Sequence, residues 1–365
     1  MTQIAERHKV SASLVFFLVH STQFGIGVLG FQRYVVKEAG NDAWISVIIM
    51  GVIVHLYIWM IYQILQRSSG SLMTLHLDLF GKWIGNGLNV VWIAFFIVNS
   101  FFVLKTYIEI IKVWMFPDLN IWIFSAIIIV LLYYILTGGF RVVTGFNFFG
   151  VVLPIYIFLL FLIFPVQFAD FHHLLPLFNH SPQEIFNGVK EMALPIIGFE
   201  TIFLFYPFVK NVHKSQKWAH IANAFTFVSY VIIMVISIAY YTEKGILKQQ
   251  WATLAMWKIV ELPLVERFEY IGIASWFIVI LPNICLYSWC AERGLTEIFG
   301  IKEKRAILFI LSAIFLAVVF ELDKKLLMLI NTTINYTAFA LIFAYIPCLY
   351  IITYIRYRLK MKRRT

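Results

Sequence analysis

Charged residues are scarce in this sequence. Asp, Glu, Lys and Arg together make up 13% of its 365 residues, whereas soluble domains usually carry about 25%. Hydrophobic residues account for 61% of the chain and aromatic residues for 18%. This composition excludes an ordinary soluble domain and predicts an all-α protein that crosses the lipid bilayer several times.

Cysteines and catalytic motifs are equally sparse. The three cysteines all lie within apolar runs and none has a Cys-x-x-Cys spacing: Cys285, Cys290 and Cys348. We therefore expect no disulfide and no metal site. The sequence also lacks a Ser-centred elbow, a P-loop and a His/carboxylate cluster, so we expect neither an enzyme nor a cofactor.

Apolar runs divide the chain into candidate membrane spans. A bilayer core of about 30 Å needs about 20 mainly apolar helical residues. Ten runs fit this description, at residues 11–32, 43–66, 83–104, 119–140, 142–169, 192–209, 218–242, 270–291, 306–320 and 326–355. The ninth run is short, but the Lys and Arg residues beside it extend toward the lipid headgroups. We predict ten transmembrane helices.

The basic residues indicate the orientation. An even number of spans places both termini on one side, and the basic tail 356–365 indicates that this side is the cytoplasm. In that orientation the inner loops carry a large excess of Lys and Arg, whereas the outer loops are nearly balanced. The net charge of +10 is therefore a topology signal, and we expect no binding to nucleic acid.

The sixth run contains an unusual stretch. Glu200 is the only charged residue between Met192 and Val209, and Gly198 and two prolines accompany it. A buried carboxylate without a partner is costly. One interpretation is a helix unwound near Gly198, so that Glu200 faces a cavity as in the discontinuous helices of transporters. The other is a kinked packing helix with a protonated structural glutamate.

The first run contains a matching stretch, Gly25-Ile26-Gly27-Val28-Leu29. Gly25 precedes Gly198 by 173 residues, and the same offset brings run 43–66 onto run 218–242. We predict one membrane domain made of two five-helix repeats, residues 11–169 and 186–355. Because five is odd, the second repeat enters from the opposite face, which is the inverted repeat of many transporters.

The two predicted breaks indicate a ligand pocket. Unwinding the first span frees N–H groups at the start of a half-helix, and these suit a carboxylate. Glu200 or Thr201 would receive an ammonium group or a proton. Asn99, Asn283 and Tyr287 are candidate side walls, with an interhelical hydrogen bond as the alternative role for each. The predicted ligand-binding residues are Phe24, Gly25, Gly27, Val28, Asn99, Gly198, Phe199, Glu200, Thr201, Asn283 and Tyr287.

Two other features leave alternatives open. His20 and His55 lie in apolar spans, where a neutral, hydrogen-bonded core histidine is favoured over a titrating one. Residues 243–269 form a long outer segment in which apolar residues recur at helical spacing, namely Leu247, Trp251, Leu254, Ile259 and Leu262. We predict a short interfacial helix there, with a gate over the site and a lid over loops as two possible roles.

The glycine break in the first span and the Gly198-Phe199-Glu200 break in the sixth resemble the amino acid permease superfamily. That superfamily has the LeuT-type fold, with five-plus-five inverted repeats and broken helices 1 and 6. A chain of this length that ends after ten spans resembles the B subunits of spore germinant receptors, a spore permease family. One departure is Gln32-Arg33, where the superfamily often has Pro-Arg.

This resemblance implies a receptor subunit that binds a small nutrient, chiefly an amino acid, and signals germination. Its implied partners are a larger A subunit and a lipid-anchored C subunit, and its implied location is the inner membrane of the spore. The alternative is a proton-coupled amino acid transporter in which Glu200 would load a proton together with the substrate.

Overall fold

The computed structural model describes residues 4–68, 70–261, 266–320 and 336–362. Within these residues the chain is almost entirely helical, and its α-helices are α1 (Val15–Gln23), α2 (Phe31–Ala39), α3 (Ala43–Gln66), α4 (Leu72–Trp114), α5 (Ile121–Thr137), α6 (Phe140–Val152), α7 (Ile155–Gln167), α8 (Pro182–Glu191), α9 (Ile202–Phe205), α10 (Val212–Leu247), α11 (Ala252–Met256), α12 (Phe268–Phe299), α13 (Glu303–Val319) and α15 (Tyr345–Lys362). A π-helical segment, Ala340–Ala344, precedes α15, and short 3-10 turns link several of the other helices.

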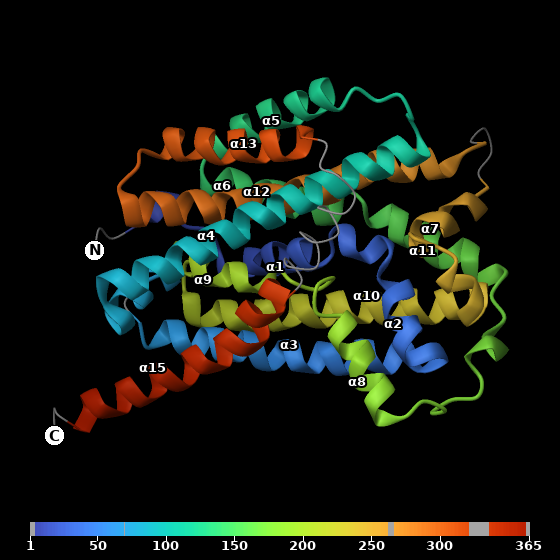
Figure 1. Cartoon of the computed structure of the whole chain (residues 1–365), viewed down its shortest axis with the longest axis horizontal. Helices are drawn as coiled ribbons and strands as arrows, with labels where there is room; N and C mark the ends of the chain where they lie inside the picture. The colour runs from blue at the N-terminus through green and yellow to red at the C-terminus, as the bar shows by residue number, and fades with distance from the viewer. Residues whose placement is uncertain (1–3, 69, 262–265, 321–335, 363–365) are drawn as a thin grey trace.

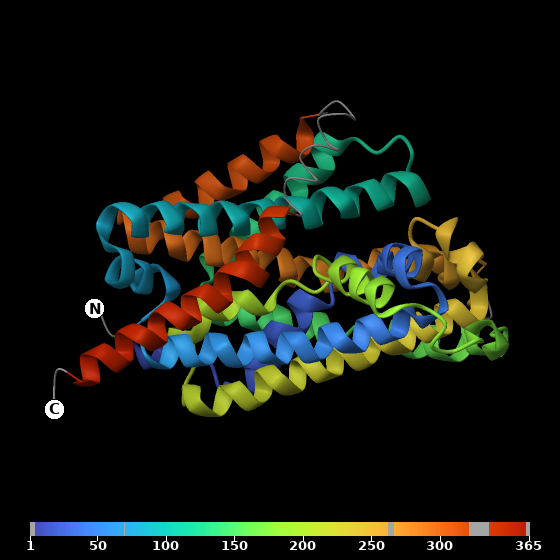
Figure 2. The ribbon, with the colours of Figure 1, turned by 60° about the horizontal axis from the view of Figure 1, so that its bottom comes forward.

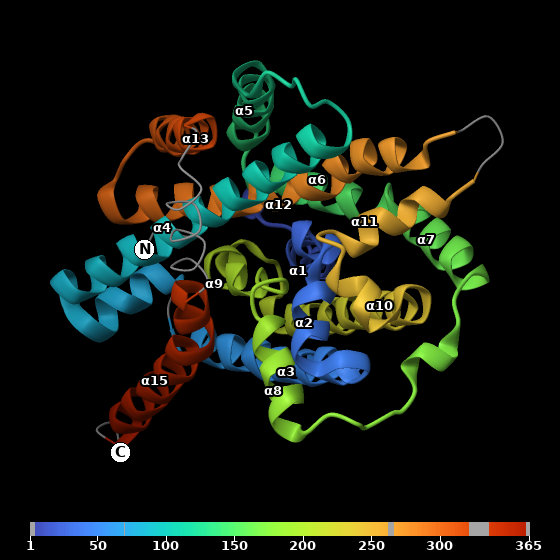
Figure 3. The ribbon, with the colours of Figure 1, turned by 45° about the vertical axis from the view of Figure 1, so that its right-hand side comes forward.

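The long helices are stacked in pairs. α3 packs beside α10, and α4 packs beside α12 (Figures 1 and 2). α1 lies between these pairs and contacts α10, α6 and α12, whereas α5 and α13 pack together beyond the α4–α12 pair (Figure 3). The first span is therefore central, so that its broken backbone is shielded by protein and not by lipid.

Both predicted helix breaks are present. α1 ends at Gln23, the 3-10 turn η3 covers Ile26–Leu29, and α2 begins at Phe31. In the sixth span, turns occupy residues 192–198 between α8 and the 3-10 turn η6 (Phe199–Thr201). Gly198 has a φ of 142°, a conformation that favours glycine. The glycine at position 198 therefore permits the break in the helix.

Several predicted spans differ from the observed helices. α4 is much longer than run 83–104 and contains a kink at Gly81, where φ is 77°. Run 142–169 is divided into α6 and α7 at Pro154, because proline cannot donate the backbone hydrogen bond that a continuous helix needs. Part of the tenth run, 326–335, lies outside the described residues.

Six helical stretches of the described chain are long and apolar enough to cross a membrane. They are Phe31–Gln66, Leu72–Trp114, Phe140–Gln167, Val212–Leu247, Phe268–Phe299 and Tyr336–Leu359. Shorter apolar helices at Ala12–Gln23, Ile121–Thr137 and Phe199–Phe208 supply further candidates. The chain is therefore a multi-pass membrane protein, while the number ten and the bounds of the two repeats stay predictions.

The outer segment differs from the expected interfacial helix. Its helical parts are the end of α10 (residues 243–247), α11, the 3-10 turn η8 (Trp257–Ile259) and the start of α12 at Phe268. Thr253, Leu254 and Trp257 are buried, so one face of this segment is packed into the protein. A carbon atom added at Gly30 would lie 2.6 Å from the carbonyl oxygen of Gln250, which shows how closely the segment approaches the first span. Leu262 lies outside the described residues.

A buried carboxylate fixes the loop before α8. Asp42 accepts hydrogen bonds from the backbone N–H groups of Phe178, Asn179 and His180 at 2.8, 2.8 and 3.1 Å. The side chain of Asp42 is completely buried. It thereby connects the start of α3 to the long connection between α7 and α8.

Candidate functional site

The carboxyl group of Glu200 is completely buried in the second break. Its Oε2 accepts a hydrogen bond from the Gly198 N–H at 2.6 Å, and its Oε1 accepts one from the Tyr287 hydroxyl at 3.3 Å. Among the described residues, no Lys or Arg forms an ion pair with it. Glu200 therefore satisfies a backbone N–H that the broken helix leaves free, and its role in ligand binding stays a prediction.

The carbonyl groups at the end of α1 are satisfied by a side chain of α12. The Asn283 Nδ2 donates a hydrogen bond to the Thr22 carbonyl oxygen at 3.0 Å. A Cβ added at Gly25 would lie 2.6 Å from the same Nδ2 atom. A side chain at Gly25 would therefore displace the amide of Asn283 from the end of α1.

The two breaks also touch each other. A Cβ added at Gly27 would lie 2.9 Å from the Cα of Pro195, and one added at Gly198 would lie 2.6 Å from the Cβ of Thr22. Thr201 donates its hydroxyl to the Gly198 carbonyl oxygen at 2.6 Å. The predicted breaks are therefore brought together, as the sequence indicated, but in this conformation the space between them is filled by protein.

Two predicted site residues have other contacts. Asn99 donates its side-chain amide to the Phe95 carbonyl oxygen one turn earlier in α4, at 2.8 Å. Phe199 is completely buried and packs edge-on against Tyr57, with ring centroids 6.3 Å apart. Their proposed roles in ligand binding have no support from these contacts, which are those of core residues.

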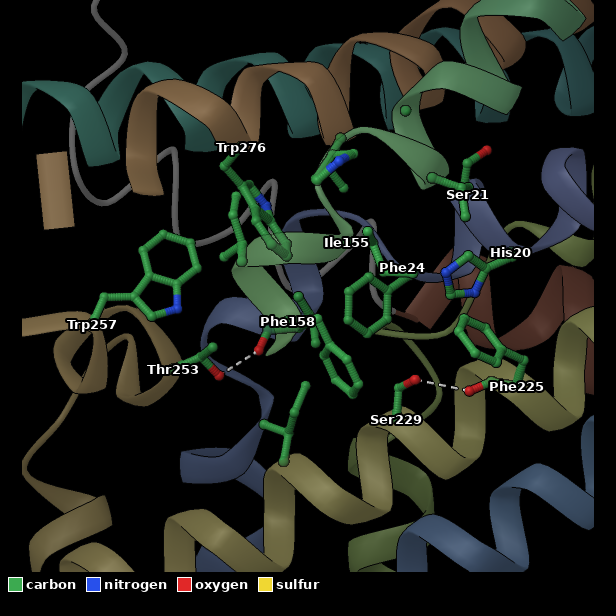
Figure 4. A pocket seen from close by; sticks show the side chains of 17 residues that line it. His20, Ser21, Phe24, Ile155, Phe158, Phe225, Ser229, Thr253, Trp257 and Trp276 are labelled. Carbon is green, nitrogen blue, oxygen red and sulfur yellow. Dashed lines mark hydrogen bonds between the residues drawn. The ribbon is translucent and has the colours of Figure 1, made fainter. Parts of the chain in front are cut away.

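Open space lies on another side of the first span. A cavity of about 70 Å³ is lined by η3, the end of α1, the α6–α7 break, α10, the outer segment and α12 (Figure 4). Its lining includes the polar residues His20, Ser21, Ser229 and Thr253. We call it the indole pocket, because the indole rings of Trp257 and Trp276 also line it. Of the eleven predicted site residues, only Phe24 and Val28 line this pocket.

The pocket wall is largely apolar, and its aromatic rings pack against one another. The ring of Phe24 stacks on His20 at 5.2 Å and lies 6.0 Å from the ring of Trp276. The His20 Nδ1 is 2.8 Å from the hydroxyl oxygen of Thr226, an arrangement typical of a hydrogen-bonded imidazole. This contact agrees with the expected core histidine, although its position on the pocket wall was not foreseen.

The outer segment closes one end of the pocket. Thr253 donates its hydroxyl to the Val28 carbonyl oxygen at 2.8 Å and accepts a hydrogen bond from the Gln32 side chain at 2.6 Å. Trp257 contributes its indole to the wall (Figure 4). Sequence reasoning missed both residues. The sequence gives no direct signal for them, because their contacts with the first span become visible only in the folded chain.

Comparison with known proteins places this arrangement in a family. A family model described as "Spore germination protein" matches residues 9–325. The chain belongs to the spore germination protein family. One family member, spore germination protein GerQB of Bacillus cereus, is 41% identical over 361 residues, which cover 99% of this chain and all of the relative. Spore germination protein A2 of Bacillus subtilis (strain 168) is 22% identical over 87% of this chain and 88% of the relative.

Solved structures show the same fold outside the family. The crystal structure of MhsT in complex with L-phenylalanine has a TM-score of 0.66 and 13% identity, over 93% of this chain and 87% of MhsT. A Na⁺-coupled sialic acid symporter in its substrate-bound, outward-open state has a TM-score of 0.61 and 11% identity, over 98% and 79%. The expected permease-like fold and the assignment to spore germination are therefore confirmed.

Proposed function

We propose that this chain is the subunit of a spore germinant receptor that binds the nutrient. It binds a small molecule beside the broken first span. The contacts between the two helix breaks then transmit the binding event to the rest of the protein. One observation carries this proposal: the indole pocket lies directly against η3, whose residue Val28 holds the outer segment through Thr253. A ligand in the pocket would therefore contact both the broken span and the segment that covers it.

The remaining features of the proposal follow from the resemblance and the charge distribution. The receptor would contain a larger A subunit and a lipid-anchored C subunit beside this chain. It would lie in the inner membrane of the spore, with both termini in the cytoplasm, as the excess of basic residues in the predicted inner loops favours. An amino acid ligand and the binding residues at the second break stay predictions.

Deletion and complementation test the receptor role. Spores that lack the gene should lose germination in response to one nutrient while they still germinate under a treatment that does not need receptors. A copy of the wild-type gene should restore the nutrient response. Unchanged germination of the deletion strain with all nutrients that trigger the parent strain would contradict the proposal.

A proton-coupled transporter is the second candidate, favoured by the buried Glu200 in a fold that solute transporters also have. Flux separates the two functions. Purified protein in vesicles should accumulate a labelled amino acid after a pH step if it is a transporter. Binding without accumulation, together with co-purification of two other subunits, would support the receptor and exclude this alternative.

A further inference from the structure

We propose that the indole pocket binds a small uncharged molecule that presents a carbonyl oxygen to the indole N–H groups of Trp257 and Trp276. The biological meaning of this site rests on the proposed function. The ligand class rests only on the groups that form the wall of the pocket. It differs from the zwitterionic amino acid that the sequence predicts.

Two hydrogen-bond donors in the wall lack an acceptor. The Nε1 atoms of Trp257 and Trp276 are buried, and neither donates a hydrogen bond to any group in the described part of the chain. The two residues are only 1% and 5% exposed. Buried polar groups are nearly always paired, because an unpaired one is costly. An indole N–H is a donor only, so the missing partner must be an acceptor.

The two donors belong to rigidly placed rings. The centroids of Trp257 and Trp276 are 5.4 Å apart, and Figure 4 shows both rings at the same end of the pocket. A Cβ added at Gly272 would lie 2.4 Å from the Trp257 ring, so the absence of a side chain there allows this ring to pack on α12. The donors are thus held in place before a ligand arrives, which lowers the entropic cost of binding.

The wall carries no formal charge. The residues that line the pocket include no Asp, Glu, Lys or Arg, and the imidazole of His20 is hydrogen-bonded to Thr226. A charged ligand would lose its hydration without gaining an opposite charge, which is strongly unfavourable. The pocket therefore favours an uncharged ligand over a carboxylate or an ammonium ion.

The hydroxyl groups of the wall complete the pattern. Ser229 already donates to the Phe225 carbonyl oxygen at 2.9 Å, and Thr253 donates to that of Val28. Both hydroxyl hydrogens are in use, so what Ser229 offers a ligand is an acceptor lone pair. The two indole donors suit the oxygen of an uncharged carboxamide, and the Ser229 lone pair is a separate acceptor on another part of the wall (Figure 4).

The size of the cavity limits the ligand. A cavity of about 70 Å³ admits only a small molecule. Isobutyramide is a small molecule that carries an uncharged carboxamide. Isobutyrate and isobutylammonium have the same branched shape with a negative and a positive charge, and therefore serve as matched probes.

Fluorine NMR tests the site in the full-length protein in lipid nanodiscs. Tryptophan is replaced throughout by 5-fluorotryptophan, and the resonances of Trp257 and Trp276 are assigned from the variants Trp257→Phe and Trp276→Phe. We expect isobutyramide to shift both resonances with a saturable, millimolar dependence, as is typical of fragments, whereas the charged probes shift neither. In the Trp276→Phe variant, the remaining Trp257 resonance should titrate with an affinity about fivefold or more weaker, because one hydrogen bond is lost.

The control variant is Trp59→Phe, which changes a tryptophan of α3 that is 38% exposed and should leave the titration unchanged. Equal or stronger binding of either charged probe would overturn the proposed ligand class. Linear, unsaturated shifts with isobutyramide would show that the pocket holds water only and would overturn the site. If the Trp257→Phe variant fails to accumulate, the titration of the Trp276→Phe variant alone tests the proposed site.

This experiment is independent of the germination assays. Saturable binding of isobutyramide together with normal germination of the deletion strain would contradict the receptor role and leave the pocket chemistry intact. Loss of the nutrient response in the deletion strain, without saturable isobutyramide binding, would support the receptor role and contradict the proposed pocket chemistry.

Discussion

Tyr287 of α12 donates a hydrogen bond to Glu200 in the break of the sixth span, over 3.3 Å. The other carboxyl oxygen of Glu200 accepts the Gly198 N–H at 2.6 Å. One buried carboxyl group thus connects a long, continuous helix to a broken one. A movement of α12 relative to the break has to stretch or exchange this contact.

Substitution of Glu200 should separate its structural role from its role in signalling. Glu200→Gln keeps the shape and one acceptor for the Gly198 N–H, so we expect near-normal abundance in membranes with a weaker nutrient response. Glu200→Leu leaves the N–H of Gly198 and the hydroxyl of Tyr287 unpaired, each at a cost of about 1–3 kcal/mol, and should lower abundance. Immunoblots of membranes measure abundance. Equal abundance of both variants would show that the carboxyl group does not support the break.

Replacement of Gly198 should destabilise the protein more than replacement of a helical glycine. In Gly198→Ala, the new Cβ meets Thr22 at 2.6 Å in a backbone conformation that disfavours side chains. Gly145→Ala is the matched control, because a Cβ there has no neighbour within 4 Å and alanine favours a helix. Thermal unfolding in detergent should give a clearly lower Tm for Gly198→Ala only. Similar Tm values would argue against the tight contact between the breaks.

Asp42 should be a stability determinant outside the site. Asp42→Ala leaves three backbone N–H groups without their acceptor, at a cost of about 3 kcal/mol or more. We expect a lower Tm and faster proteolysis between α7 and α8. Asp118→Ala, at an exposed position, should change neither quantity. Wild-type stability of Asp42→Ala would mean that water replaces the carboxylate without loss.

Thr253 should hold the outer segment on the first span. Thr253→Val keeps the shape of the side chain but removes the hydrogen bonds to Val28 and Gln32. We expect faster hydrogen exchange in α11, because local opening then needs less free energy. Thr296→Val is the control, since its hydroxyl contacts only Glu292 on its own helix. Unchanged exchange in α11 would show that apolar packing alone keeps the segment closed.

Much of the fold was predictable from the sequence, because lipid demands long apolar helices and both breaks contain glycine. The positions of Gly25 and Gly198 gave the two breaks, and run 43–66 matches α3. Helix ends were less predictable: beyond run 83–104, α4 continues to Trp114, and on the other side of Gly81 it includes a separate helical stretch that begins at Leu72. Run 142–169 was predicted from its lack of charge, which does not show the division; the sequence signal for it is Pro154 itself.

The candidate site was predictable only in part. Phe24 and Val28 were found because they lie in the glycine-rich break. Trp257 and Trp276 were missed because their indole N–H groups become informative only when burial leaves them without a partner. Glu200 lies in the second break and Asn283, a predicted side wall, contacts the end of α1. Spacing along a helix does not show that their polar groups are paired with the backbone.

The most direct test of the central claim fills the indole pocket. Ser229 and Val228 are neighbours in α10, and Ser229 is 3% exposed and lines the pocket whereas Val228 is 57% exposed. Ser229→Phe should occupy the ligand space, and Val228→Phe should not. With both variants at wild-type abundance in spores, we predict that Ser229→Phe loses the nutrient response and Val228→Phe keeps it. A normal nutrient dose response of Ser229→Phe spores would contradict the claim that the germinant binds in this pocket.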